Sequence, residues 1–289
     1  MYNVSLPIVF MHRVDEVHVG LCMQQAKYSN PSSRVILIGS PENKHLCGNN
    51  IEHFPLSQYK QGSQTFSRHY NHSSSNDYTY NLFCFLRWFV LRDFMRSQGI
   101  NRCCYLDSDV MLYTDMSKLN NDDFHDFTFE YSWTTVCELD MLDEFCEYTT
   151  KYFRDALHYE SLLQFTKELG NVPISDMVLF ILFHNYALRR KATYGSVTDS
   201  GYFDNNLNCS FAPSCPEIDM LDSKKQIYQK DGALFFKITG TNDYIHSHSL
   251  HFQGHAKAYI PYFRSQDIPN TSYPMYFDYS TCKWVSAES

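Results

Sequence analysis

The order of short apolar runs in the first 55 residues constrains the fold of this chain most strongly. Residues 6–12 are apolar and uncharged, which is typical of a buried strand. A helix is expected next, with Asp15 as its N-cap and its end near Tyr28. Two more strands are expected over 34–39 and 51–54. A strand, a helix and a strand within about thirty residues form a βαβ unit, which requires a parallel sheet.

The middle of the chain favours long helices. No proline lies between Pro55 and Pro173, and proline is the strongest breaker of a helix. Gly99 and Gly170 each follow a helical pattern and are expected at helix ends. The remaining expected elements are a loop over 57–77, helices over 77–98, 140–169 and 175–188, and strands over 102–107, 233–238 and 244–252.

Size and charge exclude several classes of protein. The 289 residues show no repeat and no linker, so we expect one domain over 1–289. A net charge of -8 argues against nucleic acid as the main partner. The longest apolar run, 177–183, is too short to span a bilayer, so no transmembrane segment is expected. The start lacks a secretory pattern and the ten cysteines lack a Cys-x-x-Cys pair, which favours a reducing, cytoplasmic location.

The sharpest motif is an acidic pair at the end of an apolar strand. Asp107 and Asp109 stand two apart, and residues i and i+2 of an extended chain point the same way. Two like charges on one side of a buried strand repel, and a Mg²⁺ or Mn²⁺ ion relieves that repulsion. The alternatives are a solvated polar turn, or a phosphatase-type Asp nucleophile. Met111, where that second pattern has Thr or Val, argues against the phosphatase.

A second motif, His-x-x-Gly-x-x-Lys, lies far downstream at His251, Gly254 and Lys257. A neutral imidazole suits Mn²⁺, and glycine lets the backbone approach a phosphate closely. Lysine offers a point charge to a leaving diphosphate. The alternatives are a strand and turn that happen to be rich in histidine, or a zinc site, which lacks cysteine or carboxylate ligands at suitable spacing.

Both motifs, in this order and with an Arg-bearing helix before the acidic pair, resemble the GT-A glycosyltransferases. The closing motif resembles the retaining glycogenin and lipopolysaccharide galactosyltransferase type, although Ala258 and Tyr259 replace the usual Pro-Trp. The resemblance implies a Rossmann-like α/β/α sandwich with a mostly parallel central sheet. It also implies a nucleotide-binding part over about 1–115 and an acceptor and C-terminal part over about 116–289.

The same resemblance implies the function and its site. The expected reaction moves a sugar from a nucleotide diphosphate sugar to a glycan or other hydroxyl acceptor, with retention and with Mn²⁺ or Mg²⁺. UDP is the expected nucleotide, and GDP stays open. The expected metal ligands are Asp107, Asp109 and His251, and the expected donor-binding residues are His12, Arg13, Asp15, Arg87, Ser108, Gly254 and Lys257.

Arg87 and Asp176 are the candidate catalytic residues. Arg87 lies on an apolar helix face, where a charge needs a partner; the donor or a structural carboxylate could supply it. Asp176 opens a helix after Pro173, where a carboxylate is favourable without any further role. In an inverting enzyme it would be the general base. The segment 204–206 is a weaker acceptor-site candidate, and a non-catalytic nucleotide-sugar or glycan binder on the same fold is the competing class.

Overall fold

In the computed structural model, the structure describes residues 5–119, 133–187, 197–198, 201–210 and 215–287. Its first sheet has the strand order β3-β2-β1-β4-β6. The first four of these strands run parallel, and β6 runs antiparallel to β4. The strands are β1 (Ile8–His12), β2 (Val35–Gly39), β3 (Glu52–Pro55), β4 (Arg102–Leu106) and β6 (Thr134–Glu138). The expected α/β class with a mostly parallel central sheet is confirmed.

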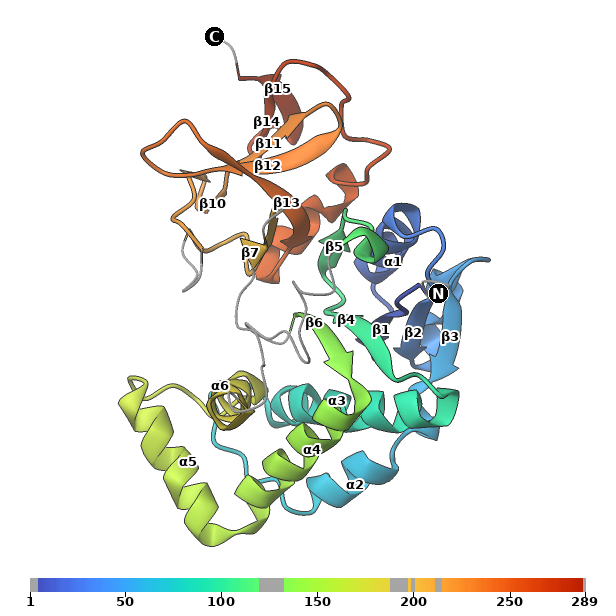
Figure 1. The fold of residues 1–289 in the computed structure, drawn as a ribbon, viewed down its shortest axis with the longest axis vertical. Helices are drawn as coiled ribbons and strands as arrows, with labels where there is room; N and C mark the ends of the chain where they lie inside the picture. The colour runs from blue at the N-terminus through green and yellow to red at the C-terminus, as the bar shows by residue number, and fades with distance from the viewer. Residues whose placement is uncertain (1–4, 120–132, 188–196, 199–200, 211–214, 288–289) are drawn as a thin grey trace.

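Helices cover both faces of this sheet (Figure 1). Ile8 and Phe10 of β1 pack into the core that includes α1, whereas Val9 and Met11 pack into the core that includes α3, α4 and α6. Alternate side chains of a strand point to opposite faces, so a strand covered on both faces must be apolar throughout. The helices are α1 (Val17–Ser29), α2 (Gln61–Ser67), α3 (Tyr78–Gln98), α4 (Leu139–Arg154), α5 (Ala156–Glu168) and α6 (Asp176–Ala187).

A second, largely antiparallel sheet follows the order β15-β14-β11-β12-β13-β8-β7, and β5 also pairs with β13. Its strands are β5 (Val110–Leu112), β7 (Val197–Thr198), β8 (Gly201–Phe203), β11 (Ile227–Lys230), β12 (Ala233–Lys237), β13 (Tyr244–His251), β14 (Met275–Asp278) and β15 (Lys283–Ser286). β9 (Met220–Leu221) and β10 (Lys224–Lys225) form a separate two-stranded ribbon. The short 3-10 helices are η1 (Pro41–Cys47), η2 (Leu56–Gln58), η3 (Met116–Lys118) and η6 (Gly254–Tyr262).

The pairing of β5 with β13 joins the two sheets at the acidic pair. The chain leaves β4, turns through 107–109 and enters β5. β5 then pairs antiparallel with β13, and His251 lies opposite Val110. The end of β13 is therefore held next to the acidic turn, although about 140 residues separate the two in sequence.

Three sequence predictions differ from the structure. Asp15 does not cap α1, because Glu16 holds the N-cap position and the Asp15 carboxylate lies 3.3 Å from His45. The expected loop over 57–77 contains α2, whose Phe66 is fully buried against the ring of Phe89. The expected helix over 140–169 is two helices, because the Asp155 carboxylate accepts from two backbone N–H groups and caps α5.

Other expectations are confirmed. Asp77 caps α3 and Gly99 ends it with a positive φ of 62°, a conformation that glycine adopts at low cost. The helix expected over 175–188 is α6, and residue 188 lies outside the described residues. Among the described residues, the helices are all too short or too polar to cross a membrane.

Candidate functional site

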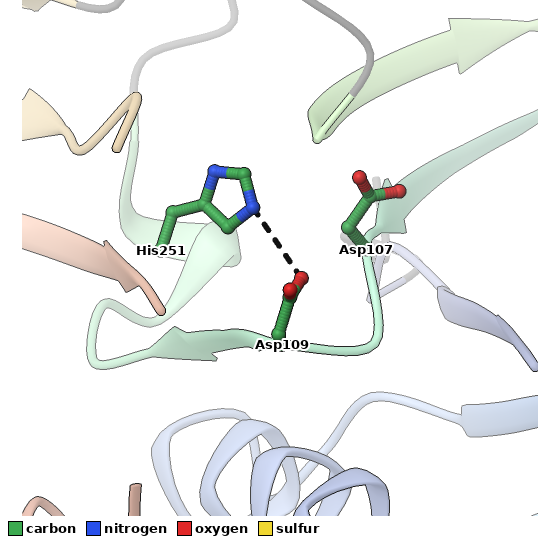
Figure 2. Close-up of side chains that lie close together, drawn as sticks. All are labelled: Asp107, Asp109 and His251. Atoms are coloured by element: carbon green, nitrogen blue, oxygen red, sulfur yellow. Dashed lines mark ion pairs between the residues drawn. The ribbon is translucent and has the colours of Figure 1, made fainter. Parts of the chain in front are cut away.

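The acidic pair lies in a tight turn after β4. The Asp107 carbonyl accepts from Val110 N–H at 3.1 Å, and Asp107 N–H donates to the Trp133 carbonyl at 2.8 Å. The Asp109 carboxylate faces the His251 ring at the end of β13, and Asp107 lies beside this pair (Figure 2). One ligand atom from each of Asp107, Asp109 and His251 lies within 4.8 Å of the other two. The three predicted metal ligands are thus brought together.

The His251 ring is held so that Nε2 faces the carboxylates. Nδ1 lies 2.7 Å from the Asn205 carbonyl, which can only accept, so Nδ1 carries the proton of that hydrogen bond. Nε2 lies 3.3 Å from Asp109 Oδ1 (Figure 2), and Trp133 stacks on the ring with centroids 5.6 Å apart. Burial lowers the pKa of His251, but the hydrogen bond and charge of Asp109 outweigh burial, and the net shift is upward.

Two carboxylates and one imidazole whose Nε2 faces them are a suitable ligand set for Mn²⁺ or Mg²⁺. The hydrogen bond at Nδ1 is the usual outer-shell support of a metal-binding histidine. Either a proton on Nε2 or a divalent cation would compensate the negative charge of the acidic pair. The residues present therefore fit the cation that the sequence implied.

Lys257 and Gly254 also reach this corner of the molecule. Lys257 Nζ lies 3.3 Å from Asp109 Oδ2, and its side chain is 36 % exposed. Burial opposes ionisation of Asp109, yet His251 and Lys257 lower its pKa below the usual value. Gly254 begins η6 with a φ of 61°, and the space where a Cβ would stand is open. The role of Lys257 at a diphosphate stays a prediction.

Arg87 bridges two buried carboxylates. Its Nη1 lies 2.6 Å from Asp107 Oδ1 and its Nη2 lies 2.7 Å from Asp176 Oδ2. Trp88 Nε1 also donates to Asp176 Oδ2, at 3.0 Å. Burial raises the pKa of Asp107, Arg87 opposes that effect and Asp109 adds to it. Of the two alternatives for Arg87, the structure shows carboxylate partners, and one of them belongs to the acidic pair; contact with a donor stays a prediction.

The residues expected to bind the nucleotide are spread around the end of β1. His12 Nε2 lies 3.1 Å from Glu16. Burial lowers the pKa of His12, and the charge of Glu16 opposes that effect. Arg13 lies 4.0 Å above the Phe83 ring. Contact of either residue with a nucleotide stays a prediction.

Asp15 and Ser108 are the other two residues expected at the nucleotide. Asp15 is half-exposed, and its carboxylate is paired with His45 at 3.3 Å. Ser108 is half-buried between the two aspartates.

A cavity of about 360 Å³ opens beside Asp107 of the acidic pair. Candidate residues from different parts of the sequence line the same cavity. It is lined by Asn76, Tyr80, Asn81, Cys84, Arg87, Asp107, Trp133, Ser175, Asp176, Met177, Asn205, Asn206, Cys209, His251 and Gln253. A larger cavity of about 650 Å³ lies at the opposite end of the sheet, next to Pro7 and Arg102, where β1 and β4 begin. The smaller cavity is the better candidate, because the carboxyl ends of parallel strands are where open α/β sheets bind ligands.

Sequence reasoning missed or misplaced several residues of this site. Trp133 and Trp88 were not singled out, although buried Trp N–H groups usually seek an acceptor. Asp204 was an acceptor-site candidate, and this is wrong, because its side chain is fully buried. Its neighbours Asn205 and Asn206 do line the cavity.

Comparison with known proteins gives distant structural likenesses only. No family model and no curated protein matches the chain. Mouse xyloside xylosyltransferase 1 in its apo form matches with a TM-score of 0.46 and 11% identity, over 69% of this chain and 87% of that one. PaToxG glycosyltransferase gives 0.36 and 12%, over 64% and 76%. GlyE of Streptococcus pneumoniae TIGR4 in its apo form gives 0.34 and 14%, over 68% of this chain and less than half, 46%, of GlyE.

Proposed function

We propose that this chain is a metal-dependent glycosyltransferase that uses a nucleotide diphosphate sugar, with UDP as the preferred nucleotide. One observation carries the proposal. The two motifs, distant in sequence, meet in space with Asp109 bonded to both His251 and Lys257. A cation site next to a lysine is the arrangement needed to hold a diphosphate from two sides.

Asp107, Asp109 and His251 would hold Mn²⁺ or Mg²⁺, which stabilises negative charge on the departing diphosphate. Lys257 would turn from Asp109 to a phosphate oxygen once the cation satisfies that carboxylate. His12, Arg13 and Ser108 would contact the nucleotide from the end of β1 and from the acidic turn, and Gly254 would let the backbone approach the phosphates. Asp15, which faces His45, is the weakest member of the proposed set.

The cavity supports an acceptor site on the other side of the acidic pair. Tyr80 and Trp133 present aromatic surface to it, and Asn76 and Asn206 present polar groups. Flat aromatic rings with nearby hydrogen-bonding groups suit sugar rings. A glycan or another hydroxyl acceptor is therefore proposed there. The proposal treats 1–289 as one domain, with a nucleotide part over about 1–115 and an acceptor part over 116–289.

Transfer with retention is proposed, because Asp176 is poorly placed as a general base. Its Oδ2 already accepts from Arg87 and Trp88, and its Oδ1 accepts from the Met177 backbone N–H. A carboxylate bonded to a guanidinium and an indole N–H gains little from taking a proton. Asp176 and Arg87 are instead proposed to bind and orient the donor sugar.

The stereochemistry of hydrolysis tests this proposal without knowledge of the acceptor. The protein with Mn²⁺ and an α-linked UDP-sugar is followed by ¹H NMR during the first minutes, before the free sugar mutarotates. The proposal predicts that the α-anomer appears first. First appearance of the β-anomer would contradict retention and restore Asp176 as a base, whereas tight binding without turnover would indicate a non-catalytic binder.

Lys257→Ala should weaken stabilisation of the diphosphate without weakening binding of the metal. Loss of one charge-stabilising group lowers turnover by about a hundredfold or more. The affinity for Mn²⁺ alone should stay equal or rise, since a cation next to Asp109 is removed. Steady-state kinetics and calorimetry with Mn²⁺ measure the two effects. Lys224→Ala, which removes a lysine over the Tyr259 ring outside the site, is the control. Equal losses of turnover in both variants would contradict the assigned role.

A further inference from the structure

A buried ion pair lies next to the backbone of His251. The side chains of Lys225 and Asp204 are 1 % and 0 % exposed, and Lys225 Nζ lies 2.6 Å from Asp204 Oδ1. Nζ also donates to Asn205 Oδ1 at 2.5 Å and to the Tyr202 hydroxyl at 3.0 Å. All three protons of the ammonium group thus have acceptors. Lys225 does not line the cavity, so contact with substrate does not account for this charge.

The ion pair acts on the backbone of His251 through Asp204. Asp204 Oδ2, the oxygen that Lys225 does not use, accepts from His251 N–H at 2.9 Å. A buried carboxylate between an ammonium and a backbone N–H has little freedom to move, because loss of either contact would leave a buried charge without a hydrogen-bond partner. Asp204 therefore fixes the point at which the chain enters the metal-binding corner.

The same lysine acts on the His251 ring through Asn205. Lys225 and Tyr202 hold the Asn205 side chain, since both donate to Asn205 Oδ1. The Asn205 carbonyl then stands 2.7 Å from His251 Nδ1. Leu207 N–H also donates to the His251 carbonyl, at 3.1 Å. The segment 204–207 thus forms hydrogen bonds with the N–H, the ring and the carbonyl of His251.

We propose that Lys225 is a positioning residue that holds the His251 ring with Nδ1–H on the Asn205 carbonyl and Nε2 directed at Asp107 and Asp109. The inference rests on the proposed metal site for its role in function. The hydrogen bond at Nδ1 itself does not depend on a metal and can be measured separately. Removal of Lys225 leaves Asp204 and the Asn205 side chain without their shared donor, so the Asn205 carbonyl is held less firmly at Nδ1.

Lys225→Met tests the proposal, because methionine keeps the length of the chain and removes the charge. Calorimetry with Mn²⁺ alone should show affinity reduced by about 10–100-fold, the usual effect of an outer-shell change. NMR of ¹⁵N-histidine protein without metal should show a hydrogen-bonded Nδ1–H proton of His251 in the wild type and a weakened or lost signal in the variant. The His251 signal is assigned by its absence in His251→Ala.

Arg92→Met is the matched control. Arg92 is a largely buried arginine that pairs with Asp93 and lies near Asp143, away from His251. The control should lose stability, while its Mn²⁺ affinity and its His251 spectrum stay as in the wild type. Equal loss of Mn²⁺ affinity in both variants would show that instability alone explains the effect and would overturn the proposal.

Tyr202→Phe is a milder second variant if Lys225→Met does not fold. It removes one hydroxyl that accepts from Lys225 and from the Asn205 backbone N–H and donates to Asn205 Oδ1. Because Lys225 stays in place, loss of these hydrogen bonds should lower the Mn²⁺ affinity by only about two- to tenfold, with a weakened Nδ1–H signal. An unchanged His251 spectrum in these variants would overturn the positioning role even if the wild type binds Mn²⁺. A wild type with the Nδ1–H tautomer and no Mn²⁺ binding would contradict the proposed function instead.

Discussion

Asp109→Asn should abolish Mn²⁺-dependent binding of a nucleotide sugar while the fold stays intact. Asparagine keeps the shape of the side chain and removes the charge that faces both His251 Nε2 and Lys257 Nζ. We expect the Mn²⁺ affinity to fall by more than the ~10–100-fold typical of an outer-shell change, because a direct ligand is lost. The melting temperature should fall modestly, because the lowered pKa of Asp109 indicates that its pairing with His251 and Lys257 outweighs its burial.

Calorimetry with Mn²⁺, and then with a nucleotide sugar in its presence, measures this effect. Asp115→Asn is the matched control: it makes the same chemical change six residues later, where the carboxylate caps a short 3-10 helix. That variant should bind Mn²⁺ as the wild type does. If Asp109→Asn bound Mn²⁺ with wild-type affinity, the acidic pair would not be part of a metal site.

Arg87→Met should give a large loss of stability. The arginine side chain is 10 % exposed and pairs with both Asp107 and Asp176. Its removal leaves the buried Asp176 and the half-buried Asp107 without their counter-charge, which costs about 3–5 kcal/mol. The melting temperature should fall by roughly 10 °C. Donor binding should weaken as well, because Asp107 loses the group that orients it.

The stability loss should depend on pH in a defined direction. Burial and Asp109 already raise the pKa of Asp107, and Arg87 opposes them. Without Arg87, the folded state takes up protons more readily than the unfolded state, so folding is favoured at low pH and disfavoured as pH rises. The difference in melting temperature from the wild type should shrink from pH 7 toward pH 4–5. A constant difference over that range would indicate lost packing in place of unpaired charge.

The residues of the candidate metal site could be picked out from sequence because they sit in local motifs. An apolar strand that ends in two aspartates places both at the carboxyl edge of the sheet, although the pair lies in a turn and not in the extended chain that the spacing suggested. What the sequence could not supply is the pairing of β5 with β13, which places His251 opposite Val110. Strand register depends on contacts across the whole sheet, so the meeting of the two motifs was inferred from resemblance.

The missed features share a different cause. Asp155 divides one expected helix into two by capping the second, and the apolar spacing on either side is compatible with a single helix. Lys225 next to Lys224 looks like a surface charge in sequence, because lysine is almost never fully buried unless it is paired. Only the fold brings Asp204 to it. Buried polar pairs of this kind depend on tertiary contacts and leave no local pattern.

The most direct test of the account is the release of nucleoside diphosphate from a panel of UDP- and GDP-sugars by the whole chain. Each sugar is incubated with Mn²⁺, with EDTA, and with EDTA followed by excess Mn²⁺. The account predicts release from at least one UDP-sugar with Mn²⁺, loss of release with EDTA, and recovery when Mn²⁺ is returned. Release that is unaffected by EDTA, or the absence of both binding and release for every sugar in the panel, would contradict it.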